Sequence, residues 1–196
     1  MPSAEEIQRY LTGAWRLATG RTDGLAMLDI SADGFWNSFF AIPVAFPALV
    51  VGWVSAANGL GGETFGGRLS VLLRLATIDL LTWVVPIALL AVLARPAGIA
   101  QRFVPYVVAS NWASALFIWM MLPPAIVNLF WPAAQQVTVL VSLLIFGVTL
   151  VLSWRLTNAV LGMGAAMASA VFAGMFGASL AILLMLQALF GVATPP

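Results

Sequence analysis

The carboxylate with the most unusual surroundings in this sequence is Asp79. It lies in the run LATIDLLTWVVP, residues 75–86, where its neighbours on both sides are mostly apolar. An ionisable group inside an apolar helix is unfavourable to bury, so such a group is a candidate functional residue. Ser110 and Asn111 form a second polar interruption, in the apolar run that begins near Phe103.

The residue types that carry most protein chemistry are missing from the chain. The sequence has no Cys and no His, and all eight basic residues are Arg. Thiol nucleophiles, imidazole bases, Schiff-base lysines and the usual ligand sets for zinc, haem and iron–sulfur clusters are therefore excluded. A lone deep carboxylate also lacks a second acid. We predict a protein that is not an enzyme, with no catalytic residue, metal or cofactor.

The composition is that of a membrane protein. Of the 196 residues, 62% are hydrophobic and 8% are charged, whereas soluble domains carry roughly 25% charged residues. Several apolar runs reach the roughly 20 residues that a helix needs to cross a bilayer. The net charge of +1 and the lack of a basic run give no reason to expect a nucleic-acid partner.

The breaks between apolar runs predict an all-α, polytopic transmembrane bundle of five helices over residues 35–196. Glycine-rich, basic and proline-containing segments separate the runs. The Pro123-Pro124 pair leaves two alternatives open, because the residues after it either finish the third span or lie along the surface. The predicted spans are about 36–57, 70–94, 103–130, 137–161 and 165–190.

Residues 1–34 form a separate N-terminal cytoplasmic or interfacial segment. Ser3 and Glu6 have the spacing of a capping box, and Gly20 is a natural helix stop. Apolar residues between them recur on one face and charged residues fall on the other, which predicts an amphipathic helix. Its apolar face either lies in the membrane interface or packs on the protein's own cytoplasmic end.

The arginines predict the orientation, because cytoplasmic loops carry an excess of positive charge. A cytoplasmic N-terminus and a periplasmic C-terminus place six of the eight on the cytoplasmic side: Arg9, Arg16, Arg21, Arg95, Arg102 and Arg155. A basic set made only of Arg would suit a bacterial genome of high GC content. The predicted location is therefore a bacterial inner membrane.

A midplane polar site is predicted from the depths of the polar residues. At about 1.5 Å per residue, Asp79 lies about 13 Å from the start of the second span and Asn111 about 12 Å from the start of the third. The site comprises Asp79, Asn111, Ser110 and Arg74. It is a hydrogen-bonded clamp between helices, a proton or cation relay in a small transporter, or an ion pair of Asp79 with Arg74 or a partner subunit.

Two further groups could make contacts outside the bundle. Arg95, Arg102 and Arg155 have no acidic residue after Asp79 to pair with, so they bind either N-terminal aspartates or anionic lipid headgroups. The last span carries small residues every four positions, which allow helices to approach closely. These rows, which include Ala170, Gly174, Ala178 and Gly177, pack within the bundle or join copies of the chain or a larger membrane complex.

Five of the eight tryptophans fall near the predicted ends of the spans. Tryptophan is enriched at membrane interfaces, where it forms aromatic belts. We therefore predict membrane anchors at Trp15, Trp36, Trp53, Trp131 and Trp154.

The pattern as a whole resembles the Yip1 family of small five-span membrane proteins. The resemblance lies in the N-terminal segment, the five spans and the final helix pair separated by Gly162-Met-Gly164. The Asp-Leu-Tyr-Gly-Pro type of signature found in eukaryotic members is absent. The resemblance implies a role in membrane organisation or trafficking through protein partners. We expect a non-enzymatic accessory, scaffold or membrane-organising component that contacts lipids, and the alternative is a small transporter or permease subunit that uses Asp79 and Asn111.

Overall fold

A computed structural model describes residues 1–60, 64–131 and 135–192, and every regular element within them is helical. Five stretches in this part of the chain are long and apolar enough to cross a membrane. This confirms the all-α class and the five long apolar helices, which fit a multi-pass membrane protein. The five stretches are Ala32–Asn58, Phe65–Leu93, Ala100–Phe130, Gln136–Leu161 and Ala165–Phe190.

The elements follow one another with short connections. The N-terminal segment holds α1 and η1, and α2 leads directly into the bundle. In chain order the elements are α1 (Ala4–Ala18), η1 (Thr22–Met27), α2 (Ala32–Ser38), α3 (Ala41–Leu60), α4 (Phe65–Leu93), η2 (Ala100–Arg102), α5 (Phe103–Met120), α6 (Leu122–Phe130), α7 (Gln135–Leu161) and α8 (Ala165–Phe190).

Two of the apolar stretches are interrupted by a break between α-helices. The first is divided between α2 and α3, and the third is divided at Met121 between α5 and α6. Pro123 and Pro124 stand in the first turn of α6, where a missing backbone N–H breaks no helical hydrogen bond. The proline pair therefore starts a new short helix.

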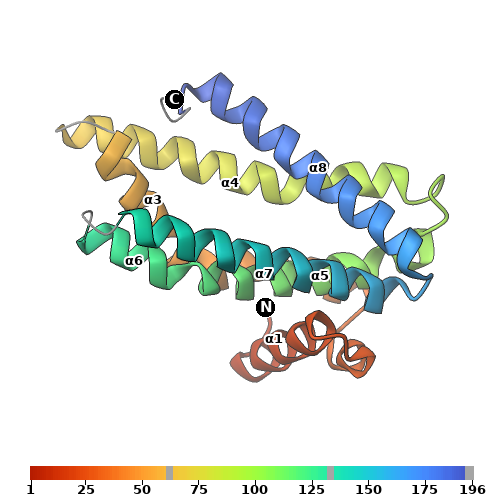
Figure 1. Ribbon diagram of the computed structural model, residues 1–196. Helices are drawn as coiled ribbons and strands as arrows, with labels where there is room; N and C mark the ends of the chain where they lie inside the picture. The colour runs from red at the N-terminus through yellow and green to blue at the C-terminus, as the bar shows by residue number, and fades with distance from the viewer. Residues whose placement is uncertain (61–63, 132–134, 193–196) are drawn as a thin grey trace.

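The five long stretches close into a ring. Contacts join α3 to α5, α5 to α7, α7 to α8, α8 to α4 and α4 back to α3, whereas α4 and α5 barely touch. Figure 1 shows α4 and α8 as one layer above α3, α5 and α7. Side chains from all five stretches face the middle of the ring.

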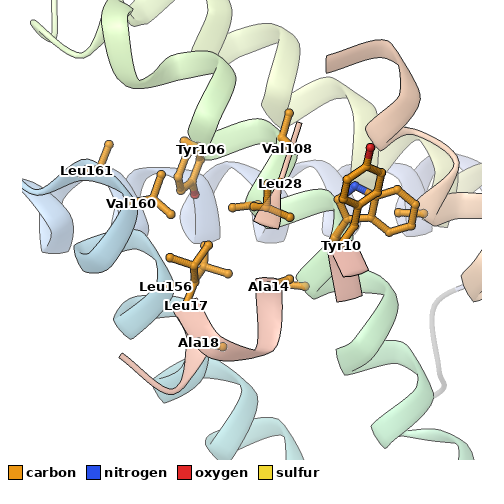
Figure 2. Packing of buried hydrophobic residues seen from close by; sticks show 14 of the residues in the cluster. Tyr10, Ala14, Leu17, Ala18, Leu28, Tyr106, Val108, Leu156, Val160 and Leu161 are labelled. Carbon is orange, nitrogen blue, oxygen red and sulfur yellow. The ribbon is translucent and has the colours of Figure 1, made fainter. Parts of the chain in front are cut away.

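The first helix packs on the protein itself. Ser3 and Glu6 form the expected capping box, with Glu6 N donating to Ser3 Oγ over 3.2 Å and Ser3 N to Glu6 Oε2 over 2.8 Å. The buried face contacts α5 and α7, and its Tyr10 ring lies 5.3 Å from that of Trp112. Figure 2 shows Leu17 of α1 next to Leu156 of α7, while Tyr10 lies at the other end of the buried face of α1.

Arg155 ties the end of α1 to α7. Its Nη2 donates to the backbone oxygen of Thr19 over 2.7 Å, and Thr19 is the C-cap of α1. Cations are favourable at this position because the last carbonyls of a helix carry partial negative charge. The α1 face predicted to be apolar is therefore in contact with the bundle.

Two glycines let α1 and η1 approach closely. A Cβ at Gly24 would overlap the carbonyl oxygen of Gly13, and one at Gly13 would lie 2.8 Å from the carbonyl oxygen of Gly24. No side chain fits between these two backbones without moving them apart.

We expect Gly24→Ala to loosen the N-terminal segment by about 1–3 kcal/mol, the usual effect of an overpacked contact. Trypsin cuts after arginine, and it can cut inside α1 only when the helix unfolds locally. The cleavage rate is therefore proportional to the fraction of molecules in which α1 is unfolded. Cleavage at Arg16 should accelerate by about tenfold for each 1.4 kcal/mol lost. The control is Gly147→Ala in α7, where no atom lies within 4 Å of the new methyl group. Equal cleavage rates in both variants would contradict the close approach.

Candidate functional site

A cavity of about 610 Å³ lies among the helices of the ring and is partly open to the surface. Two of the residues that line it, Phe146 and Phe176, are 44% and 38% exposed. Side chains from all five long stretches line it, and most of them are apolar or aromatic. Hydroxyl groups also reach it, from Thr82, Ser110, Ser114, Thr149, Ser153, Thr157 and Ser179. Among the described residues that line the cavity, Asp79 is the one with a formal charge.

Asp79 stands in the middle of α4, fourteen residues from either end of the 29-residue helix. Its Oδ2 accepts a hydrogen bond from Trp53 Nε1 of α3 over 2.6 Å. Trp53 is 6% exposed, and the Phe46 ring meets the Trp53 ring edge-on with centroids 5.8 Å apart. The carboxylate is thus held by a donor that is itself fixed by packing.

Thr82 lies one turn after Asp79 and also lines the cavity. Its hydroxyl oxygen is the one buried side-chain polar atom without a hydrogen-bond partner among the residues described. Buried polar groups in native proteins are normally bonded, so an unpaired one indicates a missing partner. Asp79 and Thr82 are three positions apart in a helix and therefore share a face.

Asn111 is the centre of a different hydrogen-bond network. Its Oδ1 accepts from Trp83 Nε1 of α4 over 2.9 Å, and its Nδ2 donates to Ser38 Oγ of α2 over 2.9 Å. Ser38 in turn donates to the carbonyl of Phe35 over 2.7 Å. Asn111 therefore joins α2, α4 and α5, and both of its amide atoms are used.

Three of the four predicted midplane residues meet at one site. Asp79, Asn111 and Ser110 all line the cavity. The predicted hydrogen bond between Asp79 and Asn111 is not formed, because Asp79 accepts from Trp53 and Asn111 bonds Trp83 and Ser38. The Ser110 hydroxyl donates to the carbonyl of Val107 in its own helix over 3.0 Å.

Arg74 lies outside this site. Its Nη1 donates over 2.8 Å to the carbonyl of Phe190, the last residue of α8. This bond fastens the start of α4 to the end of α8 and uses the arginine as a helix C-terminal cation. The alternative in which Arg74 pairs with Asp79 is therefore not the arrangement found.

The other predicted contact residues divide into two kinds. Arg155 is engaged by α1, as described above, whereas Arg95 and Arg102 are exposed beside the end of α4 and the start of α5. On α8, Ala170, Gly174 and Gly177 are exposed and Ala178 is partly exposed. No atom lies within 4 Å of a methyl group built at Gly174 or Gly177, so these positions do not pack inside the bundle.

The roles of the two tryptophans that donate to the site, Trp53 and Trp83, were not predicted from the sequence. Trp53 was expected to be a membrane anchor, which is wrong because it is buried and bonds the carboxylate. Trp83 was not predicted to have a role, although it stands four residues after Asp79 on the same helix face. Trp15, Trp36 and Trp131 are exposed, as anchors would be, while Trp154 donates to Ser169 of α8 over 3.0 Å.

Comparison of the chain with protein-family models, curated proteins and solved structures gave no match.

We expect Asn111→Leu to lower the free energy of unfolding by about 1–3 kcal/mol, because it leaves the indole of Trp83 without an acceptor and removes a bond to Ser38. Thermal unfolding in detergent micelles, followed by circular dichroism, measures this loss. The control is Ser110→Ala, which removes only a bond within α5. If both variants melt like the native protein, the Asn111 network does not hold the helices together.

Proposed function

We propose that this protein is a multi-pass membrane protein that holds a small molecule inside its helix bundle, as a small transporter or permease subunit would. The observation that carries the proposal is the cavity of about 610 Å³ lined by Asp79 and by residues from all five long stretches. Ligand sites typically measure about 300–1,000 Å³ and combine apolar walls with a few polar groups.

The cavity leaves apolar and aromatic side chains of its wall without contacts from their own chain. A molecule that fills the cavity restores those contacts. The presence of a carboxylate and several hydroxyl groups in its wall supports an occupant that needs polar partners.

The surroundings of Asp79 support the same role. A residue that served only as a clamp between helices would be expected to use both of its oxygens on donors, because an incompletely paired carboxylate is unfavourable there. Asp79 instead receives one hydrogen bond, from Trp53, among the described residues. We assign no reaction to the cavity, because its described wall holds no second acid or base beside Asp79.

The arrangement of the arginines supports an orientation. Arg95, Arg102 and Arg155 lie at the end of the bundle where α4 and α7 finish and α5 begins, and Arg155 holds the end of α1 there. By the positive-inside rule we propose that this end faces the cytoplasm. The N-terminal segment then lies on the cytoplasmic side, where the apolar face of α1 packs on α5 and α7 and its charged face, with Glu5 and Arg9, is exposed. The C-terminus faces outward across a bacterial inner membrane.

A second candidate function is a scaffold or membrane-organising component, the role implied by the Yip1 resemblance. It is favoured by the small residues of α8, which are exposed instead of packed within the chain. Small residues at this spacing let transmembrane helices meet closely. In this role α8 would contact a second copy or another membrane protein, while Arg95 and Arg102 would contact anionic lipids.

The cavity can be tested with single cysteines, because the chain has none of its own. We expect Ser114→Cys, which lines the cavity, to react with neutral methyl methanethiosulfonate in proteoliposomes. The reason is that thiols react as thiolates, which form readily only in contact with water. Mass spectrometry of the intact protein gives the rate of modification.

Two controls bracket the result. The first control is Ala115→Cys, because Ala115 is the next residue on α5 but is fully buried and does not line the cavity. The second is Leu144→Cys, because Leu144 is 71% exposed on the outer surface of α7. Both should react at least about tenfold more slowly, because the thiolate is disfavoured in apolar surroundings. Equal rates at all three positions would exclude a hydrated cavity and with it the proposed function.

The second candidate predicts association through α8. We expect Gly177→Leu to weaken energy transfer between labelled copies in vesicles, because the larger side chain keeps the helices apart. Gly147→Leu on α7, another position with free space around it, should leave energy transfer unchanged. Energy transfer that is absent in the native protein, or unaffected by Gly177→Leu, counts against association of the chain with itself.

A further inference from the structure

We propose that the molecule held in the cavity is an organic monocation with an aromatic or apolar body. This inference rests on the proposed function and names the class of its ligand. It is carried by the combination of one carboxylate, an unpaired hydroxyl group and a wall of aromatic rings around a single cavity.

The charge in the cavity is unbalanced. Asp79 is the one formally charged residue in the described wall, and the nearby arginine on α4, Arg74, is bound to the end of α8. An ionised carboxylate removed from water is unfavourable unless an opposite charge accompanies it. A cation in the cavity supplies that charge and keeps the carboxylate ionised, whereas an anion would be repelled. Beside a neutral molecule a buried carboxylate takes up a proton instead.

A bare metal ion does not fit this wall. Calcium takes six to eight oxygen ligands, and magnesium demands a near-ideal octahedron of them. The described residues contain no group of three or more His, Cys, Asp or Glu side chains that could hold a metal ion. The cavity is also far larger than an ion requires, so we assign the counter-charge to a larger molecule.

The rest of the wall suits an apolar body. Aromatic rings reach the cavity from α3, α4, α5, α7 and α8, and they include Trp53, Trp83, Phe117, Phe146 and Phe172. Aromatic faces attract cations as well as apolar groups, and tryptophan does so most strongly. A cation whose charge is surrounded by carbon also loses less hydration on entering a membrane than a small ion does.

The polar end of the ligand belongs near α4. Asp79 has one oxygen that Trp53 does not use, and Thr82, on the same face of the helix, has an unpaired oxygen. These two acceptors lie where the positive group of the ligand would meet the carboxylate. Trp53 is a positioning residue in this arrangement, because it fixes the orientation of Asp79.

Tetraphenylphosphonium and tetraphenylborate test the inference, because they share a shape and differ in the sign of their charge. Equilibrium dialysis against the purified protein in uncharged detergent measures the affinity for each. We expect the phosphonium to bind at least about tenfold more tightly than the borate, and Asp79→Asn to remove at least about tenfold of that affinity. Asp33→Asn removes an exposed carboxylate outside the cavity wall and should keep the preference.

Equal binding of the two ions, or an unchanged preference in folded Asp79→Asn, would overturn the inference. If Asp79→Asn does not fold, a second experiment tests the inference in a protein that keeps Asp79: protection of Ser114→Cys from chemical modification by the bound ion. The phosphonium should then slow modification of Ser114→Cys by the neutral reagent, and the borate should not.

The hydrated cavity and the cationic ligand are refuted by different outcomes. A reactive Ser114→Cys without selective protection by the phosphonium leaves a hydrated cavity and refutes the cationic ligand. An unreactive Ser114→Cys refutes the cavity as a binding site, and the cationic ligand with it.

Discussion

The hydrogen bond between Trp53 and Asp79 is the interaction around which the interior of this protein is organised. In an apolar bundle a carboxylate has no water to stabilise it, so its partner must come from another helix. The indole of Trp53 supplies that partner and joins α3 to α4 over 2.6 Å. Because Phe46 packs against the indole, the carboxylate is held in one place at the edge of the cavity.

The same constraint explains how the helices are joined elsewhere. Asp79 and Asn111 are held by partners from other elements, whereas hydroxyl groups at depth, such as those of Ser110 and Thr157, donate to carbonyls of their own helix. At the ends of the bundle, arginines bind helix-terminal carbonyls: Arg74 holds the end of α8 and Arg155 the end of α1. Thr82 departs from this pattern within the described chain, and it does so at the cavity.

The cavity and the exposed face of α8 divide the functional candidates between the inside and the outside of the bundle. The interior offers charge, hydroxyl groups and aromatic rings to a small molecule. The outer face of α8 offers only small residues and free space, which is suited to another helix. The two roles are compatible, because no described residue of the small-residue rows Ala170, Gly174 and Ala178 lines the cavity.

The sequence by itself determined the class of protein, the five apolar helices and the residues that interrupt them. Those features depend on local composition and on runs of about 20 residues, which the bilayer requires wherever the helices pack. The capping box at Ser3 and Glu6 was likewise predictable, because its partners are three residues apart. Asp79, Asn111 and Ser110 were recognised as candidates for the same reason, since a polar residue in an apolar run is visible without a structure.

Only the tertiary structure decided which groups meet. Depth along a helix can be counted from the sequence, but the direction in which a side chain points depends on how each helix is rotated against its neighbours. The hydropathy of helices that are apolar on all sides gives no signal for that rotation. For this reason Trp53 looked like a membrane anchor, Asn111 looked like the partner of Asp79, and the cavity between them could not be foreseen.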